Sequence, residues 1–305
     1  MATSRLAVLV RVSSIVDVEG FAMTMRLRFS VLCTILLELA GCASTQRPAP
    51  VGVRLYVLYC GEAKIPDISP WSPGVNVGQP AVFSDNCYLI RHGNQWMLWD
   101  SGYPDSIADL PDGIAGPRNM RAYRSRTLVS QMAEIGVAPD QVAYVAFSHS
   151  HGDHVGNANL FTAATWYVQQ AEYDAAFGPD PTKYGFNPVN YAKLRDGKVV
   201  KLSGDYDVFG DGSVKILSTP GHTPGHQSLL VHLTNTGAII LSGDVAHFED
   251  NFINRRVPGF NFNVDQSRQS MDRVDAIVKS EHAQLWFNHD SKQSATIAHA
   301  PKYYE

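Results

Sequence analysis

The stretch from His149 to His154 constrains this chain more than any other. Its six residues hold three imidazoles and one carboxylate, since His151 and Asp153 lie between the two ends. Histidine is the commonest metal ligand because a neutral ring nitrogen offers a lone pair near neutral pH. Side chains this close along the chain cannot all share one ligand sphere, so the stretch favours two metal ions over one. It follows an apolar run at 142–147, typical of a buried strand, and strand ends carry site residues in layered α/β folds.

Three further apolar runs each end in a side chain that can hold a metal ion. The runs and the side chains that follow them are 214–218 with His222, 238–241 with Asp244, and 284–287 with His289. Strand ends at one sheet edge can converge on a single cleft. With the first stretch they provide five histidines and two aspartates. That set is enough to hold two divalent ions with open positions for water and substrate.

Composition indicates one large domain. The chain has 305 residues, of which 45% are hydrophobic, and this is ample for a buried core. A formal net charge of -4 with scattered basic residues argues against a nucleic-acid-binding surface. No interior segment is long and apolar enough to span a membrane. We therefore predict a single domain over residues 53–305.

Residues 1–41 are typical of a bacterial lipoprotein signal. Two arginines precede a short apolar run at 29–37, and the Leu-Ala-Gly-Cys sequence that ends at Cys42 resembles a lipobox. We expect Cys42 to carry the lipid and residues 42–52 to form a polar, Pro-containing tether. The prediction is an exported protein, anchored to a bacterial membrane on the periplasmic side or at the cell surface. An ordinary signal peptide is the alternative.

Two cysteines remain in the predicted domain, Cys60 and Cys87, and both lie in apolar, strand-like runs. In an exported protein they can form a disulfide. Two buried free thiols fit the same runs equally well. Neither cysteine has the spacing of a metal-binding motif, so the sequence leaves the disulfide and the free thiols open.

Periodicity predicts the other elements. Strands are expected at 53–60, 87–90, 95–99, 142–147, 163–169, 214–218, 228–233, 238–241 and 284–287, and helices at 127–135, 170–177 and 265–279. The stretches 61–79 and 178–198 are rich in turn-forming residues and are expected to be irregular. The strands expected at 87–90 and 95–99 are connected through His92-Gly93-Asn94, a sequence that favours a hairpin turn.

An ordered set of residues resembles the motif of the metallo-β-lactamase superfamily: His149-x-His151-x-Asp153-His154, His222, Asp244 and His289. The resemblance covers residue 53 to about residue 289. It implies an αββα sandwich, in which two mixed β-sheets lie between helix layers. It also implies that Asp100 and His226 hydrogen-bond the ligands instead of holding metal. From the residues alone, a turn-forming role for Asp100 is equally consistent.

Within that superfamily, the segments 86–90, 219–229 and 287–290 resemble the N-acyl homoserine lactonases, which are quorum-quenching enzymes. This implies that the substrate is an N-acyl homoserine lactone and the product an N-acyl homoserine. Two positions depart from the well-known members. His247 stands where they have a Tyr that approaches the substrate carbonyl, and Gly152 stands where they have a bulky residue.

The resemblance implies two divalent metal ions per chain, with zinc expected and cobalt, manganese or iron compatible with the ligand types. The implied ligands are His149, His151 and His222 for one ion, Asp153, His154 and His289 for the other, and Asp244 as the bridge. A metal-bridging hydroxide would attack the lactone carbonyl. The expected catalytic side chains are Asp153, which would pass a proton to the leaving oxygen, and His247, which would donate a hydrogen bond to the carbonyl.

An acyl chain needs an apolar channel, and aromatic residues outside the predicted core strands are the candidates to line it. They are Trp71, Tyr184, Phe186, Phe260 and Phe262. A purely structural role is the alternative for each of them. The predicted partners are the lactone and, through the lipid, a membrane, and a homodimer stays open.

Other functions share the ligand set. An ester, thioester or organophosphate hydrolase of the same superfamily is the main alternative. A bridging Asp244 argues against a β-lactamase, and the C-terminus lacks a basic patch for a glutathione carboxylate. A lipid-anchored binding protein with a structural metal site is the non-enzymatic alternative. A flavodiiron oxidoreductase would need a flavin domain, for which no residues remain.

Overall fold

The computed structural model describes residues 52–305. The predicted signal at 1–41, Cys42 and all but the last residue of the tether at 42–52 lie outside the described residues. Within the described part, no helix has the length and apolar character needed to cross a membrane.

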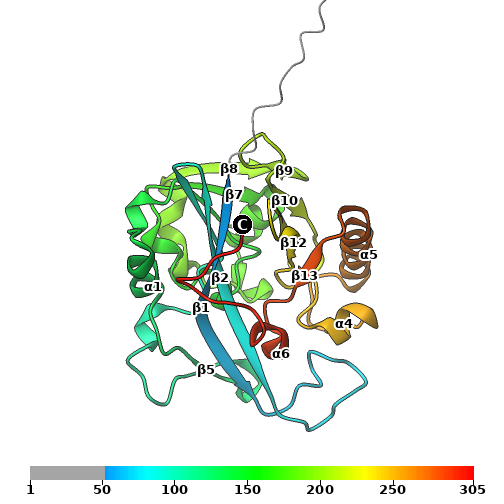
Figure 1. Ribbon diagram of the computed structural model, residues 1–305. Helices are drawn as coiled ribbons and strands as arrows, with labels where there is room; N and C mark the ends of the chain where they lie inside the picture. Colours follow the sequence, from blue (N-terminus) through cyan, green and yellow to red (C-terminus); the bar gives the residue numbers. More distant parts are fainter. Residues whose placement is uncertain (1–51) are drawn as a thin grey trace, which may run out of the picture. The chain divides into compact units, whose positions relative to one another are not determined.

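The strands form two β-sheets (Figure 1). They are β1 Val53–Ile65, β2 Ala81–His92, β3 Gln95–Trp99, β4 Ile114–Ala115, β5 Arg121–Tyr123, β6 Tyr144–Ala146, β7 Thr165–Gln169, β8 Lys198–Leu202, β9 Tyr206–Asp207, β10 Val214–Ser218, β11 Gln227–Leu233, β12 Gly237–Leu241 and β13 Gln284–Trp286. The larger sheet has the order β4-β5-β1-β2-β3-β6-β7-β8, and the smaller has the order β13-β12-β11-β10-β9. Each contains both parallel and antiparallel pairs.

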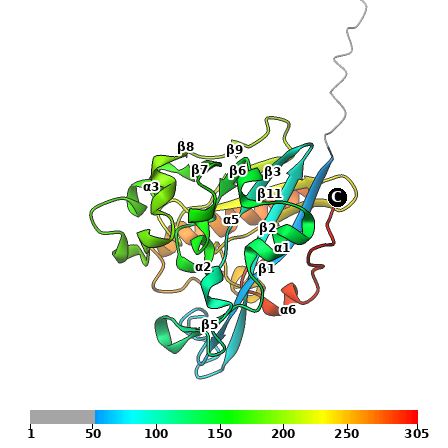
Figure 2. The same cartoon turned by 90° about the vertical axis from the view of Figure 1, so that its left-hand side faces the viewer.

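Helices cover the outer faces of the two sheets. They are α1 Leu128–Ile135, α2 Gly152–Val155, α3 Gln170–Ala176, α4 Glu249–Ile253, α5 Val264–Glu281 and α6 Ser291–Ser294. Side chains of α1 and α3 pack on the larger sheet, and those of α5 pack on the smaller one. Figure 1 shows α1 and α5 on opposite sides of the strands, and Figure 2 looks onto the α1 side. The predicted αββα sandwich is therefore confirmed.

Strand periodicity explains why both faces of each sheet are buried. In β2, Tyr88 and Ile90 face the core between the sheets, whereas Leu89 faces the helix side. In β11, Val231 belongs to the core between the sheets and Leu230 packs with α5. Successive side chains point to opposite faces of a strand, so two buried faces require the continuous apolar runs seen in the sequence.

The first strand is longer than expected. β1 runs to Ile65, so the prediction that a loop begins at residue 61 was wrong. Gly61 has a φ of +138° and marks a register shift between β1 and β2, after which pairing resumes. A glycine inside a strand can mark a bulge as well as an end. The short elements β4, β5, β9, α4 and α6, and the strand β8 at the end of the supposed irregular stretch 178–198, were also not expected.

Cys60 and Cys87 form a disulfide between the neighbouring strands β1 and β2. Both cysteines are buried in the core under α1. The structure thus decides between the two alternatives that the sequence left open.

Candidate metal centre and active site

Strand direction brings the predicted ligands together. β10 and β12 are each antiparallel to β11, and β13 is parallel to β12, so β10, β12 and β13 all run the same way. Their C-terminal ends lead to His222, Asp244 and His289. In the larger sheet, β3 and β6 are parallel and lead to Asp100 and the 149–154 stretch. Parallel strands place their carboxyl ends at one edge, so residues far apart in sequence meet there.

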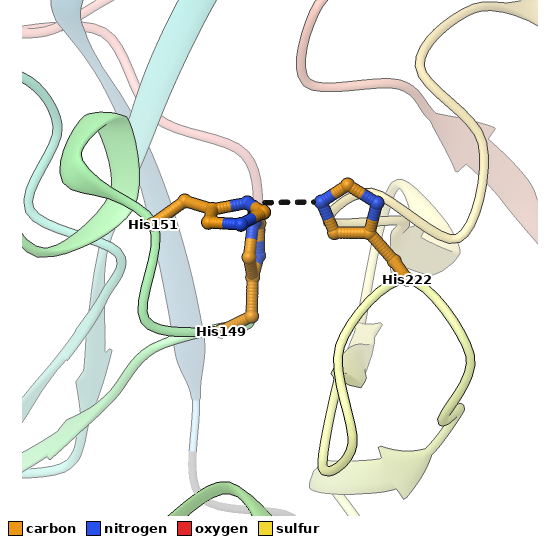
Figure 3. A group of neighbouring side chains, drawn as sticks. All are labelled: His149, His151 and His222. Carbon is orange, nitrogen blue, oxygen red and sulfur yellow. Dashed lines mark hydrogen bonds between the residues drawn. The ribbon is translucent and has the colours of Figure 1, made fainter. Parts of the chain in front are cut away.

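Three histidines form the first group. His149 Nε2 lies 2.8 Å from His151 Nδ1, and His151 Nδ1 lies 3.0 Å from His222 Nε2. Figure 3 shows the rings of His149 and His151, from one loop, facing His222 on the opposite loop. The three inward nitrogens lie within 4.8 Å of one another, close enough to ligate one ion.

The second group consists of Asp153, His154 and His289. Asp153 presents Oδ1 at 4.0 Å from His154 Nε2 and Oδ2 at 3.8 Å from His289 Nε2. Their ligand atoms also lie within 4.8 Å of one another. Asp153 and His154 lie on the short helix α2, which starts directly after His151.

Asp244 lies between the two groups. Its Oδ2 is 3.4 Å from His222 Nε2 and 3.8 Å from His149 Nε2. Its Oδ1 is 3.2 Å from His289 Nε2 and 3.5 Å from His154 Nε2. Each oxygen of one buried carboxylate therefore faces a different group, which is the arrangement of a bridging ligand.

The outer nitrogen of each of these five histidines is also bonded. The contacts are His149 Nδ1 with Ser148 Oγ at 3.1 Å, His151 Nε2 with Tyr184 O at 2.8 Å, His154 Nδ1 with Asp100 Oδ2 at 3.0 Å, His222 Nδ1 with Asn261 Oδ1 at 3.1 Å, and His289 Nδ1 with Ser84 O at 2.9 Å. A ring N–H donated outward fixes the tautomer and leaves the inward nitrogen with a free lone pair. This pattern is characteristic of metal-binding histidines.

The residues fit divalent cations. His154 Nε2 and Asp244 Oδ1 are buried and have no hydrogen-bond partner among the described residues. Buried polar atoms are nearly always paired in folded proteins, so these two atoms indicate a site suited to a cation. Imidazole nitrogens and carboxylate oxygens suit zinc and its first-row neighbours.

Burial and neighbouring charges shift the pKa values of these histidines in opposite directions. Burial lowers the pKa of His149 and of His222 well below the usual value. Burial also disfavours charge on His154, but the carboxylates of Asp100 and Asp244 outweigh it and raise the pKa of His154 well above the usual value. Against burial, Asp244 likewise raises the pKa of His289 to about 9. In the absence of metal, protons on His154 and His289 offset the negative charges of Asp100, Asp153 and Asp244, and a cation would displace these protons.

Asp100 and His226 lie behind the ligands. Asp100 has a left-handed backbone with a φ of +57°, and its Oδ1 accepts a 2.6 Å hydrogen bond from the Ser148 amide. His226 Nε2 accepts from the Asp244 amide at 2.8 Å, and its Nδ1 donates to Thr219 O at 2.9 Å. Burial lowers the pKa of His226 to about 4, consistent with its role as an acceptor. Both side chains therefore orient ligands and keep no free nitrogen or oxygen for a metal.

Glu172 joins the two ligand loops, and sequence reasoning missed it. This buried carboxylate of α3 accepts from the Ser150 amide at 2.8 Å, from Thr223 Oγ1 at 2.8 Å and from the Gly225 amide at 3.0 Å. A Cβ on Gly225 would lie 2.3 Å from the Glu172 amide nitrogen, so the contact requires glycine. A glutamate in a short predicted helix carries no sequence signal of this role.

His247 differs from the five ligand histidines. Its Nε2 lies 3.4 Å from Asp244 Oδ2, but its Nδ1 is buried with no partner among the described residues. With His222 and Asp244 it is close enough to hold an ion, yet it lacks the outward hydrogen bond that fixes a ligand histidine. Burial lowers its pKa to about 4, so the ring is neutral. It faces the cavity as a neutral hydrogen-bonding group.

A cavity of about 1100 Å³ opens onto the site and is lined by Asp153, Asp244 and His247. Four of the five predicted aromatic residues line it: Trp71, Tyr184, Phe260 and Phe262. Trp71 is also packed into the core, with 6% of its surface exposed. Phe186 is not on the cavity wall. It is buried with its ring centre 5.6 Å from that of His151, where it supports a ligand from behind.

Comparisons with known proteins agree with this geometry. Residues 81–279 match the family model of the metallo-beta-lactamase superfamily. The chain is 32% identical over 267 residues to the N-acyl homoserine lactonase AttM of Rhizobium johnstonii, with 83% of this chain and 98% of that protein covered.

Solved structures are similar as well. A variant of the Bacillus thuringiensis lactonase AiiA, with N-decanoyl-L-homoserine bound at its active site, has a TM-score of 0.73 and 28% identity, covering 84% of this chain and 100% of that one. An N-acyl homoserine lactone hydrolase with the product N-hexanoyl-L-homoserine at its catalytic metal centre has a TM-score of 0.72, with the same identity and coverage.

We predict that metal binding releases about two protons per chain near neutral pH, because His154 and His289 lose theirs to the incoming cations. Since both pKa values are raised, metal affinity should still increase as the pH rises through about 9, the pKa of His289, and it should fall as the solution is acidified. Calorimetric titration of metal-free protein with Zn²⁺ in two buffers of different ionisation enthalpy measures the proton number. In Asp100→Asn, which removes the largest charge that raises the His154 pKa, the number should fall toward about one. Proton release near zero in the unchanged protein would contradict the assignment.

Glu172→Gln should weaken metal binding by about 10- to 100-fold, the usual effect of losing a hydrogen bond that orients ligands. The amide can no longer accept from all three donors, so the two ligand loops lose their common anchor. Metal competition with a chromophoric chelator measures the affinity, and circular dichroism checks the fold. Glu134→Gln, an exposed glutamate of α1, is the matched control and should bind metal normally. A folded Glu172→Gln protein with unchanged affinity would refute the anchoring role.

Proposed function

The chain belongs to the N-acyl homoserine lactonase family of the metallo-beta-lactamase superfamily, and we propose that it opens the lactone ring of N-acyl homoserine lactones to give N-acyl homoserines. The observation that carries the proposal is the carboxylate of Asp244, shared between two groups of ligands at the base of a large cavity with an aromatic wall. That site offers both hydrolytic chemistry and room for an acyl chain.

We infer that two zinc ions are the resident metals. His149, His151 and His222 would hold one, Asp153, His154 and His289 would hold the other, and Asp244 would touch both. When bound, the ions supply a water of lowered pKa as the nucleophile and polarise the ester carbonyl.

Two side chains of the protein act on the reacting groups. Asp153 lines the cavity with 23% of its side chain exposed, so its carboxylate can receive the proton of the attacking water and deliver it to the ring oxygen as the C–O bond breaks. His247 is neutral and faces the same space, and it donates its N–H to the carbonyl oxygen as that oxygen gains negative charge. The product carries a free hydroxyl and a carboxylate.

The cavity wall offers an apolar surface on which the acyl group of the substrate can bind. Trp71, Phe260 and Phe262 give one side an apolar surface. Gly152 adds no side chain to the wall, and a Cβ there would meet Asn190 Nδ2 at 3.5 Å. The space that a bulky residue would occupy is therefore left to substrate.

We also propose that the protein is exported from the cytoplasm. The lipobox-like sequence ending at Cys42 supports a lipid-anchored protein on the periplasmic side or at the cell surface. The Cys60–Cys87 disulfide supports it independently, because disulfides persist in oxidising compartments. There the enzyme would meet lactones that diffuse between cells.

The proposed function predicts metal-dependent hydrolysis of N-acyl homoserine lactones. The metal-loaded protein should open lactones of several chain lengths, and incubation with a chelator should abolish turnover until Zn²⁺ is restored. Proton release at constant pH and mass spectrometry of the ring-opened product measure the reaction. Nitrocefin, S-lactoylglutathione and an organophosphate ester are the comparison substrates. Turnover of one of these with no lactone opened would refute the lactonase assignment.

His247→Ala should lower kcat for lactones by about 100-fold, the effect of removing one donor to a developing oxyanion. Its metal content, measured by mass spectrometry of the same sample, should be unchanged. His247→Tyr restores a donor and should recover much of the rate. An unchanged kcat in His247→Ala would rule out the donor role, and a loss of one metal equivalent would make His247 a ligand instead.

A further inference from the structure

The guanidinium of Arg118 lies on the cavity wall with its charge unpaired. Its Cζ is 4.1 Å from the ring centre of Phe260 and 5.5 Å from that of Trp71. Among residues 52–305, no side-chain or main-chain oxygen accepts a hydrogen bond from it and no carboxylate pairs with it. The turn that carries it, Pro117–Asn119, joins β4 to β5 at the edge of the larger sheet.

A continuous aromatic wall leads from the ligand site to this residue. The ring of Phe83 stacks on His289 with centres 5.5 Å apart, and Trp71 meets Phe83 edge-on at 5.3 Å. Phe260 follows at 5.8 Å from Trp71, and Arg118 lies over Phe260. All five line the cavity. An acyl chain whose ester group is held at the ligands can therefore extend along this wall toward Arg118.

Arg118 is held in a way that leaves its donors free. Arg118 is an exposed residue whose Cζ lies over the Phe260 ring, and no described residue occupies the N–H groups in the plane of its guanidinium. The backbone of Arg118 and Asn119 is left-handed, with φ values of +52° and +58°. Two consecutive non-glycine residues in this region are uncommon, and surrounding contacts must hold them there. The turn thus presents a cation with unused donors to an otherwise apolar wall.

We propose that Arg118 selects acyl chains that carry an oxygen acceptor, a keto or hydroxyl group, by donating hydrogen bonds to that oxygen. A plain alkyl chain would cover these donors without replacing the water they bond, whereas an oxygenated chain satisfies them. The proposal rests on the lactonase function and names the subclass of substrate.

The test compares kcat/KM for lactones of equal chain length that bear a keto group, a hydroxyl group or no oxygen on the acyl chain. The unchanged enzyme should prefer an oxygenated chain by about tenfold, the effect of a hydrogen bond from a charged donor. Arg118→Met keeps an apolar stem on Phe260 but has no donor. The ratio of kcat/KM for the oxygenated chain to kcat/KM for the plain chain should therefore fall toward one, mainly through an increase in KM for the oxygenated substrate. Arg118→Lys, which keeps the charge without the planar donors, should lie between.

Lys183→Met is the matched control. Lys183 is the other Lys or Arg side chain among the described cavity-lining residues, and its Nζ lies 4.6 Å from the centre of the Tyr184 ring. Its removal should leave the ratio unchanged, and an equal fall in both variants would overturn the assignment to Arg118. A ratio near one in the unchanged enzyme, or an unaltered ratio in Arg118→Met, would refute the selection while leaving the lactonase function intact. Failure of the unchanged enzyme to open any lactone would refute both.

Discussion

The structure depends on one buried negative charge. Asp244 has 4% of its surface exposed and faces four histidines of the two groups, two through each oxygen. Burying a carboxylate is costly unless it is paired, and burial alone would raise its pKa. The surrounding histidines reverse that effect and hold the pKa of Asp244 well below the usual value. The buried site therefore tolerates the Asp244 carboxylate because positive charge on the surrounding groups compensates it, and not because of packing alone.

Hydrogen bonds from residues behind the site hold the histidines and Asp244 in fixed positions. Asp100 orients His154 from the larger sheet, and His226 orients the Asp244 backbone from the smaller one. Glu172 connects the first ligand loop with the loop that carries His222. The two sheets therefore meet through polar contacts at the edge where their strands end, and through apolar packing elsewhere. A change in any of these supports is expected to alter metal binding without touching a proposed metal ligand.

Much of the fold was predictable because it depends on local pattern. Apolar runs with two buried faces predicted most strands, and the helix expected at 127–135 is present as α1, with Thr127 as its N-cap and Gly136 as its C-cap. Some short elements, such as β4 with two residues and α6 with four, were missed because they show no period. Gly61 was taken for the end of a strand because a bulge and a loop have the same sequence signal.

By itself, the sequence determined which side chains were available for metal binding and the order of the strands that carry them, because ligand chemistry and strand periodicity are properties of residue type and spacing. Only the tertiary structure decided which atoms meet. It joined Cys60 to Cys87, placed Phe186 behind His151 and not in the cavity, and put Arg118 over Phe260. Contacts of this kind join residues that are far apart along the chain. They depend on strand direction and register, which one-dimensional patterns do not contain.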